Sequence, residues 1–497
     1  MTNLRLAVGA AMLALVSASM AVAATPESQG VSSRAILNWL DACERELDSL
    51  HGFVLMRHGE VIAEGSWAPY TTLETPHMLY SHSKSFTSSA IGFLVDDGKL
   101  DLDERVIDIF PDKAPANPCE NLRQLRVRDL ITMNVGAFHT DAERNDINGD
   151  WEKAFLGNTF EKAPGTSFRY DSGATYMLAA IVERRSGMKL MDFLKARMFD
   201  KIGITRAWST VSPSGTACGG WGMHMTTREL ALFGQLYLNG GLWQGERVLS
   251  PEWVALATAR QTWSGAIGVA KEDGNDWHQG YGFQFWRCQP SSVYRADGAN
   301  GQLTVIMPEQ DAVLSVHAGL DDMQKELSLV WEHLLPAFGE KPLPEDPQLT
   351  AELNTRLTTL TLKPVEGDRE GVERFCNQAI KTGHDRLREV KLVKTAEGLV
   401  CEITTGAGEY RLPVGFGEWK RGELVIDKGV TESLGVMIGP KSAVATSAAI
   451  TKYGQLKLRS WFLNGPHLLE LTFIKQDGKV TLNGGIRGLG GFYLSIK

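Results

Sequence analysis

The stretch "HMLYSHSKSFTSSAIGFLVDDGKL", from His77 to Leu100, contains the pattern on which the interpretation of the whole chain depends. Its tetrapeptide "SHSK" places Ser81 three residues before Lys84. Between residues 83 and 95 apolar side chains recur at helical spacing, and a glycine at position 98 ends the pattern. Residues at i and i+3 share one face of a helix, so Ser81 and Lys84 can touch if the helix begins near Ser81.

A neighbouring serine and lysine can carry out nucleophilic chemistry. A serine hydroxyl is a weak nucleophile until a base removes its proton, and lysine is such a base when burial lowers its pKa. The positive end of the helix dipole would also stabilise the alkoxide. A second pattern of the same kind, Ser186 and Lys189, brackets Gly187, which marks a helix C-terminus where the dipole opposes an alkoxide. We therefore predict Ser81 as the nucleophile.

The histidine beside the nucleophile is a weaker candidate for a base. His82 follows Ser81 directly, and one residue along a helix turns the side chain by about 100°, so we expect it to miss Ser81. His139, in "NVGAFHTD", is expected to be a loop residue near the cleft.

Length and composition limit the classes of protein that fit. The chain has 497 residues, of which 43% are hydrophobic and 22% charged, with a formal net charge of −8. These values are ordinary for a soluble globular protein, and the length predicts more than one domain. No block of basic residues is present, so we expect no nucleic-acid partner.

The first 23 residues have the pattern of a secretory signal peptide. Arg5 precedes a short apolar run that ends in the A-x-A pattern of Ala21 and Ala23. A membrane anchor is the alternative, but the run is short and no cysteine for lipid attachment lies near the cleavage site. We expect an exported protein, periplasmic or secreted, with no stable membrane anchor.

Beyond this leader the sequence predicts two domains. From residue 24 to 338, long helical patterns mix with hairpin-type strands, which indicates an α+β domain. A proline-rich linker is expected at 339–352. From 353 to 497, apart from a short helical stretch near "LTAELNTRL", short strands alternate with glycine turns, which predicts a small all-β barrel. The six cysteines are widely spaced and specify no disulfide pairing.

Several motifs occur in the order found in one known family. "YSHSKSFTSSAIGFLVDDGKLDLDERV", "FRYDSGATYMLAAIVERRSG", "GGWGMHMTTRELALFGQLYLNGG" and "YRADGANGQLTVIMPEQDAV" resemble serine β-lactamase-related hydrolases over about residues 30–338. That group includes class C β-lactamases, D-alanyl-D-alanine carboxypeptidases, D-aminopeptidases, esterases and 6-aminohexanoate-dimer hydrolases. The resemblance implies an antiparallel sheet flanked by helices, and the C-terminal barrel is similar to the lipocalin-like domains of some members.

The resemblance assigns the first two motifs to particular residues. Ser81 and Lys84 match S-x-x-K. The second motif, Y-x-N, is here Tyr170-Asp171-Ser172, and its tyrosine would shuttle protons to and from the nucleophile and the leaving group. Ser172 can still bond to Lys84 or to substrate, but it lacks the two donors of an asparagine amide.

The third motif departs from the family. K-T-G or H-x-G becomes Ala296-Asp297-Gly298, so the cation that helps to hold a substrate carboxylate is absent. Arg295 does not simply replace it, because adjacent strand residues point to opposite faces.

The oxyanion hole is less affected by this departure. The resemblance assigns it to the backbone N–H groups of Ser81 and Ala299. Gly298 and Gly301 are expected to let the strand approach the substrate closely.

Together these features predict a serine hydrolase that cleaves small-molecule or peptide-like esters or amides through an acyl-enzyme on Ser81. No metal or organic cofactor is implied, and the oligomeric state stays open. Two alternatives remain: a true β-lactamase or D-Ala-D-Ala carboxypeptidase, against which the missing cation weighs, and a catalytically silent ligand-binding protein, against which the intact Ser81, Lys84 and Tyr170 weigh.

Overall fold

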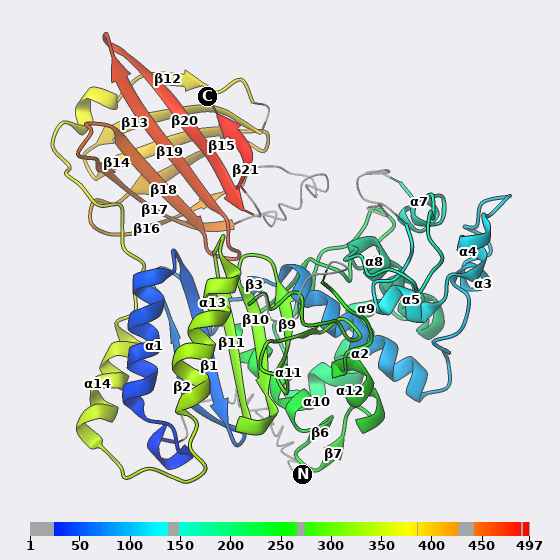
Figure 1. The fold of residues 1–497 in the computed structure, drawn as a ribbon. Coiled ribbons are helices and arrows are strands. Elements are labelled where there is room, and N and C mark those ends of the chain that lie inside the picture. Colours follow the sequence, from blue (N-terminus) through cyan, green and yellow to red (C-terminus); the bar gives the residue numbers. More distant parts are fainter. Residues whose placement is uncertain are drawn as a thin grey trace, which may run out of the picture.

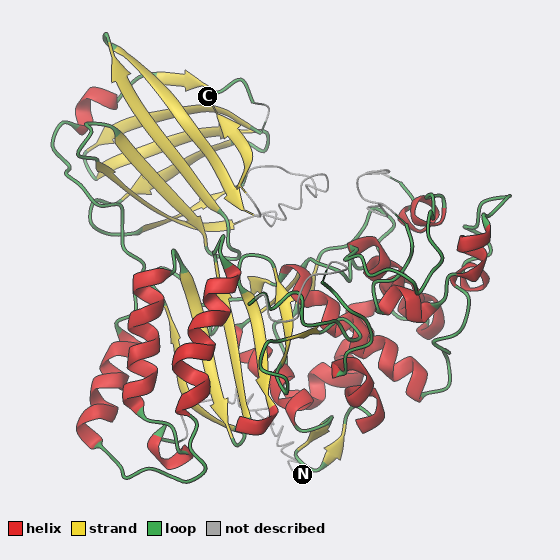
Figure 2. Ribbon diagram, in the orientation of Figure 1, coloured by secondary structure: helices red, strands yellow, loops and turns green. Residues whose placement is uncertain are grey.

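The computed structural model describes residues 24–137, 149–265, 274–384, 386–425, 442–488 and 491–496 (Figure 1). The predicted signal peptide, residues 1–23, and His139 lie outside the described residues. Figure 2 shows a part rich in helices with a sheet inside it, followed by a part made almost wholly of strands. Within the described ranges, no helix is long and apolar enough to cross a membrane.

A six-stranded antiparallel sheet forms the centre of the first part, in the order β2-β1-β11-β10-β9-β8. Its strands β1 and β11 are buried along their whole length, which explains their nearly continuous apolar sequences. Helices α1, α13 and α14 lie along one face of the sheet, and α11 packs against β1, β10 and β11 (Figure 1). The strands of this sheet are β1 (Leu50–Arg57), β2 (Glu60–Ser66), β8 (Trp286–Arg287), β9 (Tyr294–Gly298), β10 (Gln302–Met307) and β11 (Ala312–Ala318).

The remaining helices of this part gather around a second apolar core. Helix α2 packs against α8 and α9 and is buried on nearly every side, so it is the central helix of this region. The described α-helices are α1 (Ser33–Glu46), α2 (Ser83–Asp96), α3 (Val106–Ile109), α4 (Glu120–Gln124), α5 (Val127–Ile131), α7 (Trp151–Leu156), α8 (Ser172–Ser186), α9 (Leu190–Leu194), α10 (Asp200–Ile202), α11 (Thr227–Leu238), α12 (Pro251–Thr258), α13 (Met323–Leu329) and α14 (Pro347–Thr358).

Two small antiparallel sheets complete the first part. One has the order β3-β5-β4 and pairs His77 with Met225, just before the turn that carries Ser81. Their strands are β3 (His77–Met78), β4 (Trp208–Ser209), β5 (Met223–Met225), β6 (Leu242–Trp243) and β7 (Glu246–Arg247). The α+β prediction for this part is confirmed.

The C-terminal part contains a four-stranded sheet, β12-β13-β14-β15, and a six-stranded sheet, β16 to β21 in chain order. Alternate side chains of both sheets point inward and form one apolar cluster that fills the space between them. Strands β15 and β16 lie side by side. Gly415, directly after β15, forms an isolated bridge with Ser447 of β17, through hydrogen bonds to Thr446 O at 3.2 Å and from Ala448 N–H at 2.9 Å. The likeness to a lipocalin stays a prediction.

The strands that the structure describes in this part alternate with turns, as predicted. They are β12 (Ala379–Lys381), β13 (Leu387–Thr395), β14 (Gly398–Thr405), β15 (Glu409–Val414), β16 (Lys420–Leu424), β17 (Ser442–Ile450), β18 (Leu456–Phe462), β19 (Leu468–Gln476), β20 (Lys479–Gly488) and β21 (Gly491–Ile496).

The connection between the two parts contains a helix. Helix α14 begins at Pro347, inside the predicted linker, and packs against α1 and β2 of the first part. Arg356 of α14 pairs with Glu44 of α1 at 2.5 Å. These contacts favour a domain boundary after α14, and we propose that the β-rich domain begins there.

Candidate active site

Ser81 lies in η2 (Tyr80–His82), a single tight turn between β3 and the first residue of α2. The turn is held on both sides, because Leu79 N–H donates to Met223 O at 2.9 Å and the Ser83 hydroxyl donates to Tyr80 O at 2.7 Å. The nucleophile candidate is therefore fixed at the N-terminal end of a buried 14-residue helix.

Lys84 reaches back along the same helix face to Ser81, as the spacing predicts. Its Nζ lies 3.0 Å from Ser81 Oγ, 3.0 Å from Ser172 Oγ and 2.7 Å from Gly220 O. The side chain is only 1% exposed. Of these partners the carbonyl can only accept, whereas a serine hydroxyl can also donate, so a neutral amine could accept the proton of Ser81 while it donates to Gly220 O.

Tyr170 brings a second proton carrier to the same serine. Its hydroxyl is hydrogen-bonded to Ser81, and its ring stacks on Trp286 with a centroid distance of 5.4 Å. Lys84 Nζ lies 4.8 Å from the centre of the Tyr170 ring. Burial raises the pKa of Tyr170 well above its ordinary value, and the hydrogen bond to Ser81 opposes part of that rise. The phenol is therefore protonated at neutral pH.

Ser172 is held by the start of α8. The Asp171 carboxylate accepts hydrogen bonds from the N–H groups of Gly173 at 2.8 Å and Ala174 at 3.2 Å, as an N-cap does. Ser172 is thereby the first residue of the helix, with its hydroxyl at Lys84. The structure thus brings Ser81, Lys84, Tyr170 and Ser172 together.

Strand β9 places the third-motif residues on two faces. Ala296 is fully buried in the core around α2. On the opposite face Arg295 Nε donates to Asp297 Oδ2 at 2.8 Å, and the guanidinium lies 4.6 Å from the centre of the Trp277 ring. Strand β9 pairs with β10 in regular register. No bulge therefore turns the Arg295 side chain to the face of the strand on which Ala296 lies.

Asp297 is a buried carboxyl close to the charged groups of the site. Burial raises its pKa, while the Arg295 guanidinium and, more weakly, Lys84 oppose the rise. Since its side chain is 6% exposed and already paired, Asp297 presents little free negative charge to the cleft.

The two glycines of this strand and turn have different neighbours. A Cβ at Gly298 would lie 2.0 Å from Leu79 O and 3.1 Å from His82 N, so this glycine lets β9 approach the nucleophile turn. A Cβ at Gly301 would lie 2.6 Å from a carboxylate oxygen of Glu326. The close approach expected of Gly301 is therefore made to Glu326. Ala299, between them, packs against Met78 and Tyr80.

Comparison with known proteins agrees with this geometry. The Beta-lactamase family model matches residues 40–331, more than half of the chain. The chain belongs to the β-lactamase family. A 6-aminohexanoate-dimer hydrolase of Paenarthrobacter ureafaciens is 27% identical over 313 residues, which cover 59% of this chain and 78% of the relative. A D-aminopeptidase of Brucella anthropi is 28% identical over 165 residues, 31% of each chain.

One solved structure supports the fold. A Bacillus anthracis protein, for which 6-aminohexanoate-dimer hydrolase activity has been suggested, superposes with a TM-score of 0.51 at 19% identity. The match covers 62% of this chain and 83% of that one. The predicted β-lactamase-like fold of the first domain is confirmed, and the chain is a serine hydrolase of the β-lactamase family.

The other candidates from the sequence, His82 and the pair Ser186 and Lys189, take no part in this site. His82 is fully buried beside Phe86, its Nδ1 lies 3.3 Å from Gln302 O, and burial lowers its pKa to about 3. Ser186, at the last turn of α8, donates to Val182 O at 2.6 Å, while Lys189 pairs with Glu183 at 2.8 Å. The helix C-terminus expected at Gly187 is confirmed by its left-handed φ of 72°.

Sequence reasoning missed two groups that complete this β-lactamase-family site. Gly220 O accepts from Lys84, and the only signal for it was the glycine-rich "GGWG" at residues 219–222. Gln302 Nε2 donates to Ala299 O at 3.1 Å and to Ala318 O at 2.7 Å, which fixes the turn that carries the Ala299 amide. No sequence pattern singled out Gln302.

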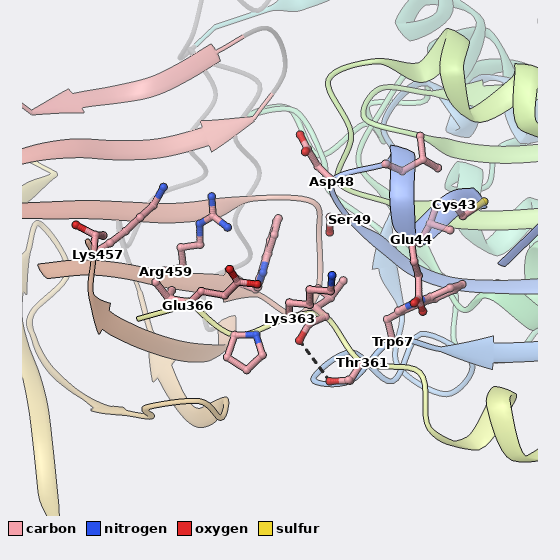
Figure 3. A pocket seen from close by; sticks show the side chains of 17 residues that line it. Cys43, Glu44, Asp48, Ser49, Trp67, Thr361, Lys363, Glu366, Lys457 and Arg459 are labelled. Atoms are coloured by element: carbon pink, nitrogen blue, oxygen red, sulfur yellow. Dashed lines mark hydrogen bonds between the residues drawn. The ribbon is translucent and has the colours of Figure 1, made fainter. Parts of the chain in front are cut away.

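A separate cavity of about 400 Å³ lies between the two domains, and none of its lining residues belongs to the motifs (Figure 3). In Figure 3 Lys457 and Arg459 enter it from the β-rich domain, and Asp48 and Trp67 from the first domain. Both basic side chains are paired with Glu470, at 3.1 and 2.8 Å. The cavity contains no arrangement for nucleophilic chemistry among the residues that line it.

Proposed function

We propose that this hydrolase cleaves ester or amide bonds through a covalent acyl-enzyme on Ser81. One observation carries the proposal: Lys84 Nζ lies 3.0 Å from Ser81 Oγ, and the Tyr170 hydroxyl bonds to the same serine. A serine activated in this way is the arrangement that nucleophilic catalysis requires.

In the acylation step, neutral Lys84 accepts the Ser81 proton while Oγ attacks the substrate carbonyl. The carbonyl oxygen becomes an oxyanion, which the backbone N–H groups of Ser81 and Ala299 stabilise. When the carbonyl re-forms, the leaving group takes a proton from Tyr170, which regains one from protonated Lys84. The buried, protonated phenol of Tyr170 suits this donor role.

Deacylation reverses the same transfers with water as the nucleophile. The water oxygen attacks the acyl carbon while Tyr170 passes a proton of the water to Lys84. The bond between the acyl carbon and Ser81 Oγ then breaks, and Lys84 returns a proton to Oγ. Ser172 and Gly220 O hold Lys84 in place through both steps, at 3.0 and 2.7 Å from Nζ.

The proposed substrates are neutral or cationic esters and amides. At the third motif a buried alanine stands where the family has its cation, and Arg295, although close enough to Tyr170 to influence its pKa, is fully buried and bonded to Asp297. A carboxylate-bearing substrate therefore lacks a charge-assisted bond, which is worth about 1.5–3 kcal/mol. The names of the relatives, a 6-aminohexanoate-dimer hydrolase and a D-aminopeptidase, support amide substrates.

A penicillin-recognising enzyme is the second candidate, since one relative is a penicillin-binding protein 4 of Amycolatopsis lactamdurans, 27% identical over 253 residues. Comparing kcat/KM for nitrocefin and for a neutral p-nitrophenyl ester separates the two. We expect the ester to be the better substrate. Nitrocefin hydrolysis on a par with dedicated β-lactamases would reverse the assignment.

The role of Ser81 is tested by hydrolysis of short p-nitrophenyl esters. Ser81→Ala should abolish turnover, and the fold should survive, because loss of a hydroxyl at a helix start costs about 0.5–2 kcal/mol. Ser186→Ala is the matched control and should leave turnover intact. Turnover that persists in Ser81→Ala would contradict the assignment of Ser81, whereas a wild-type protein without turnover would favour the silent-binder alternative. We also propose that the protein is exported after cleavage behind Ala23. Determining the N-terminal residue of the mature protein tests this.

A further inference from the structure

The β-rich domain contacts the residues that lead directly into the nucleophile turn. The hairpin between β18 and β19, residues 463–467, reaches the first domain, and Asn464 O accepts a hydrogen bond from Met78 N–H at 2.9 Å. Met78 is three residues before Ser81. The hairpin therefore supplies a backbone partner to the strand on which the nucleophile depends.

A second contact from the same hairpin reaches the residue next to Ser81. His467 Nε2 and the Tyr80 hydroxyl are 2.8 Å apart, and both side chains are buried. Tyr80 has a φ of 48°, a left-handed conformation that is unfavourable for a bulky side chain. Such a conformation persists only where its surroundings hold it, and His467 holds the far end of this ring.

Tyr80 also contacts Ala299, whose backbone N–H is the second donor of the proposed oxyanion hole. Its ring and Met78 form a small apolar cluster with Ala299 and Trp221. A shift of Tyr80 would therefore move the Ser81 amide through the chain and the Ala299 amide through side-chain packing.

Packing and a hydrogen bond between the two domains fix the position of the hairpin relative to the nucleophile turn. Trp461 and Leu463 of the β-rich domain belong to the same apolar core as Phe53 of the central sheet. The hydroxyl of Tyr70 donates to the hairpin at Gly465 O, at 3.2 Å. The hairpin is therefore a fixed part of the first domain's core.

We infer that the β18–β19 hairpin of the C-terminal domain is a structural part of the active site, and that Tyr80 and His467 are positioning residues for Ser81 and the oxyanion hole. The inference rests on the proposed function, because it assumes that Ser81 is the nucleophile. It gives the β-rich domain a role in catalysis through the hydrogen bond between Tyr80 and His467.

The test uses the full chain and a fluorophosphonate probe together with a neutral p-nitrophenyl ester. Tyr80→Phe and His467→Ala remove the same hydrogen bond from opposite domains. Each should lower kcat and the rate of labelling by about 10–100-fold, as a displacement of about 1 Å does, while KM stays within about twofold. Because one bond is lost in both, the double variant should be no slower than the slower single variant.

Two further variants separate positioning from general stability. His467→Gln keeps an amide that can bond to the phenol, so it should restore most of the activity. Arg487→Met removes the ion pair with Asp321, an interdomain contact of 3.6 Å away from the nucleophile turn. This control should leave kcat within about twofold of wild type, since exposed ion pairs contribute about 0–1 kcal/mol.

The outcomes distinguish this inference from the function on which it rests. If Ser81→Ala is inactive but Tyr80→Phe keeps wild-type kcat, the positioning role is wrong and the proposed function stands. If Ser81→Ala is still labelled, the proposed function fails and the inference with it. Multiplicative losses in the double variant, or a His467→Gln variant as slow as His467→Ala, would also overturn the role. If His467→Ala does not fold, Tyr80→Phe and His467→Gln decide alone.

Discussion

Lys84 and Tyr170 contact the same serine oxygen, which makes a prediction about how their losses combine. Lys84→Ala and Tyr170→Phe should each lower kcat by about 10²–10⁴-fold, the range of general acid–base catalysis. Because both carriers move the same proton, the double variant should be much less impaired than the product of the single losses. Single-turnover kinetics with a p-nitrophenyl ester measures this. Fully multiplicative losses would mean that the two groups act on separate steps.

A second prediction at this scale concerns the buried imidazole beside the nucleophile. Burial lowers the pKa of His82 from 6.5 to about 3, so the folded protein does not take up this proton between those values. Below pH 6.5 the unfolded chain does take it up, and the free energy of unfolding therefore falls as the pH falls. At pH 5 the loss from one such histidine is about 2 kcal/mol.

His82→Phe should remove this contribution, since the side chain lies between Phe86 and Phe233. Urea unfolding at pH 7.5 and pH 5 measures it for both proteins. The variant should lose about 2 kcal/mol less than wild type between the two pH values. An equal loss in both proteins would show that His82 is not buried as a neutral imidazole.

At the scale of elements, strand β9 and the nucleophile turn are in such close contact that position 298 tolerates only glycine. A Cβ at Gly298 would lie 2.0 Å from Leu79 O, and this clash is with a backbone atom, which cannot rotate away as a side chain can. Gly298→Ala should push the turn and the Ala299 amide apart and lower kcat by about 100-fold.

The matched control is Gly157→Ala, where a new Cβ would lie 3.2 Å from Lys153 O and 3.6 Å from Ala154 O, and so would touch neither β9 nor the nucleophile turn. Ester hydrolysis should be unchanged in this control. Wild-type kcat in Gly298→Ala would contradict the role given to the contact between β9 and the turn.

At the scale of the whole molecule, local patterns predicted elements better than they predicted contacts between domains. The helix that starts at Ser83, the hairpin of β1 and β2, and the alternating strands of the second domain follow from periodicity and turn residues. The approach of Lys84 to Ser81 follows from helical spacing alone.

The rest of the site depends on tertiary contacts that leave no local signal. His467 lies 387 residues from Tyr80 in the chain. Gln302 is close in the chain to Ala299, but its second bond, to Ala318, depends on the pairing of β10 with β11. Most of helix α14 was predicted, as the helical stretch near "LTAELNTRL", but its first turn lies inside the predicted linker, although Pro347 is a favourable first residue of a helix. Gly301 is close to Glu326, which belongs to helix α13. The pattern of the strand residues around Gly301 could not reveal this contact.

The central claim is that Ser81 forms the covalent intermediate, and mapping a label on the whole protein tests it most directly. Mature protein is incubated with a fluorophosphonate probe, digested and examined by mass spectrometry, with Ser81→Ala and Ser186→Ala alongside. We predict a single labelled peptide modified at Ser81, equal labelling in Ser186→Ala and none in Ser81→Ala. Label on another serine, or label that persists in Ser81→Ala, would contradict the account.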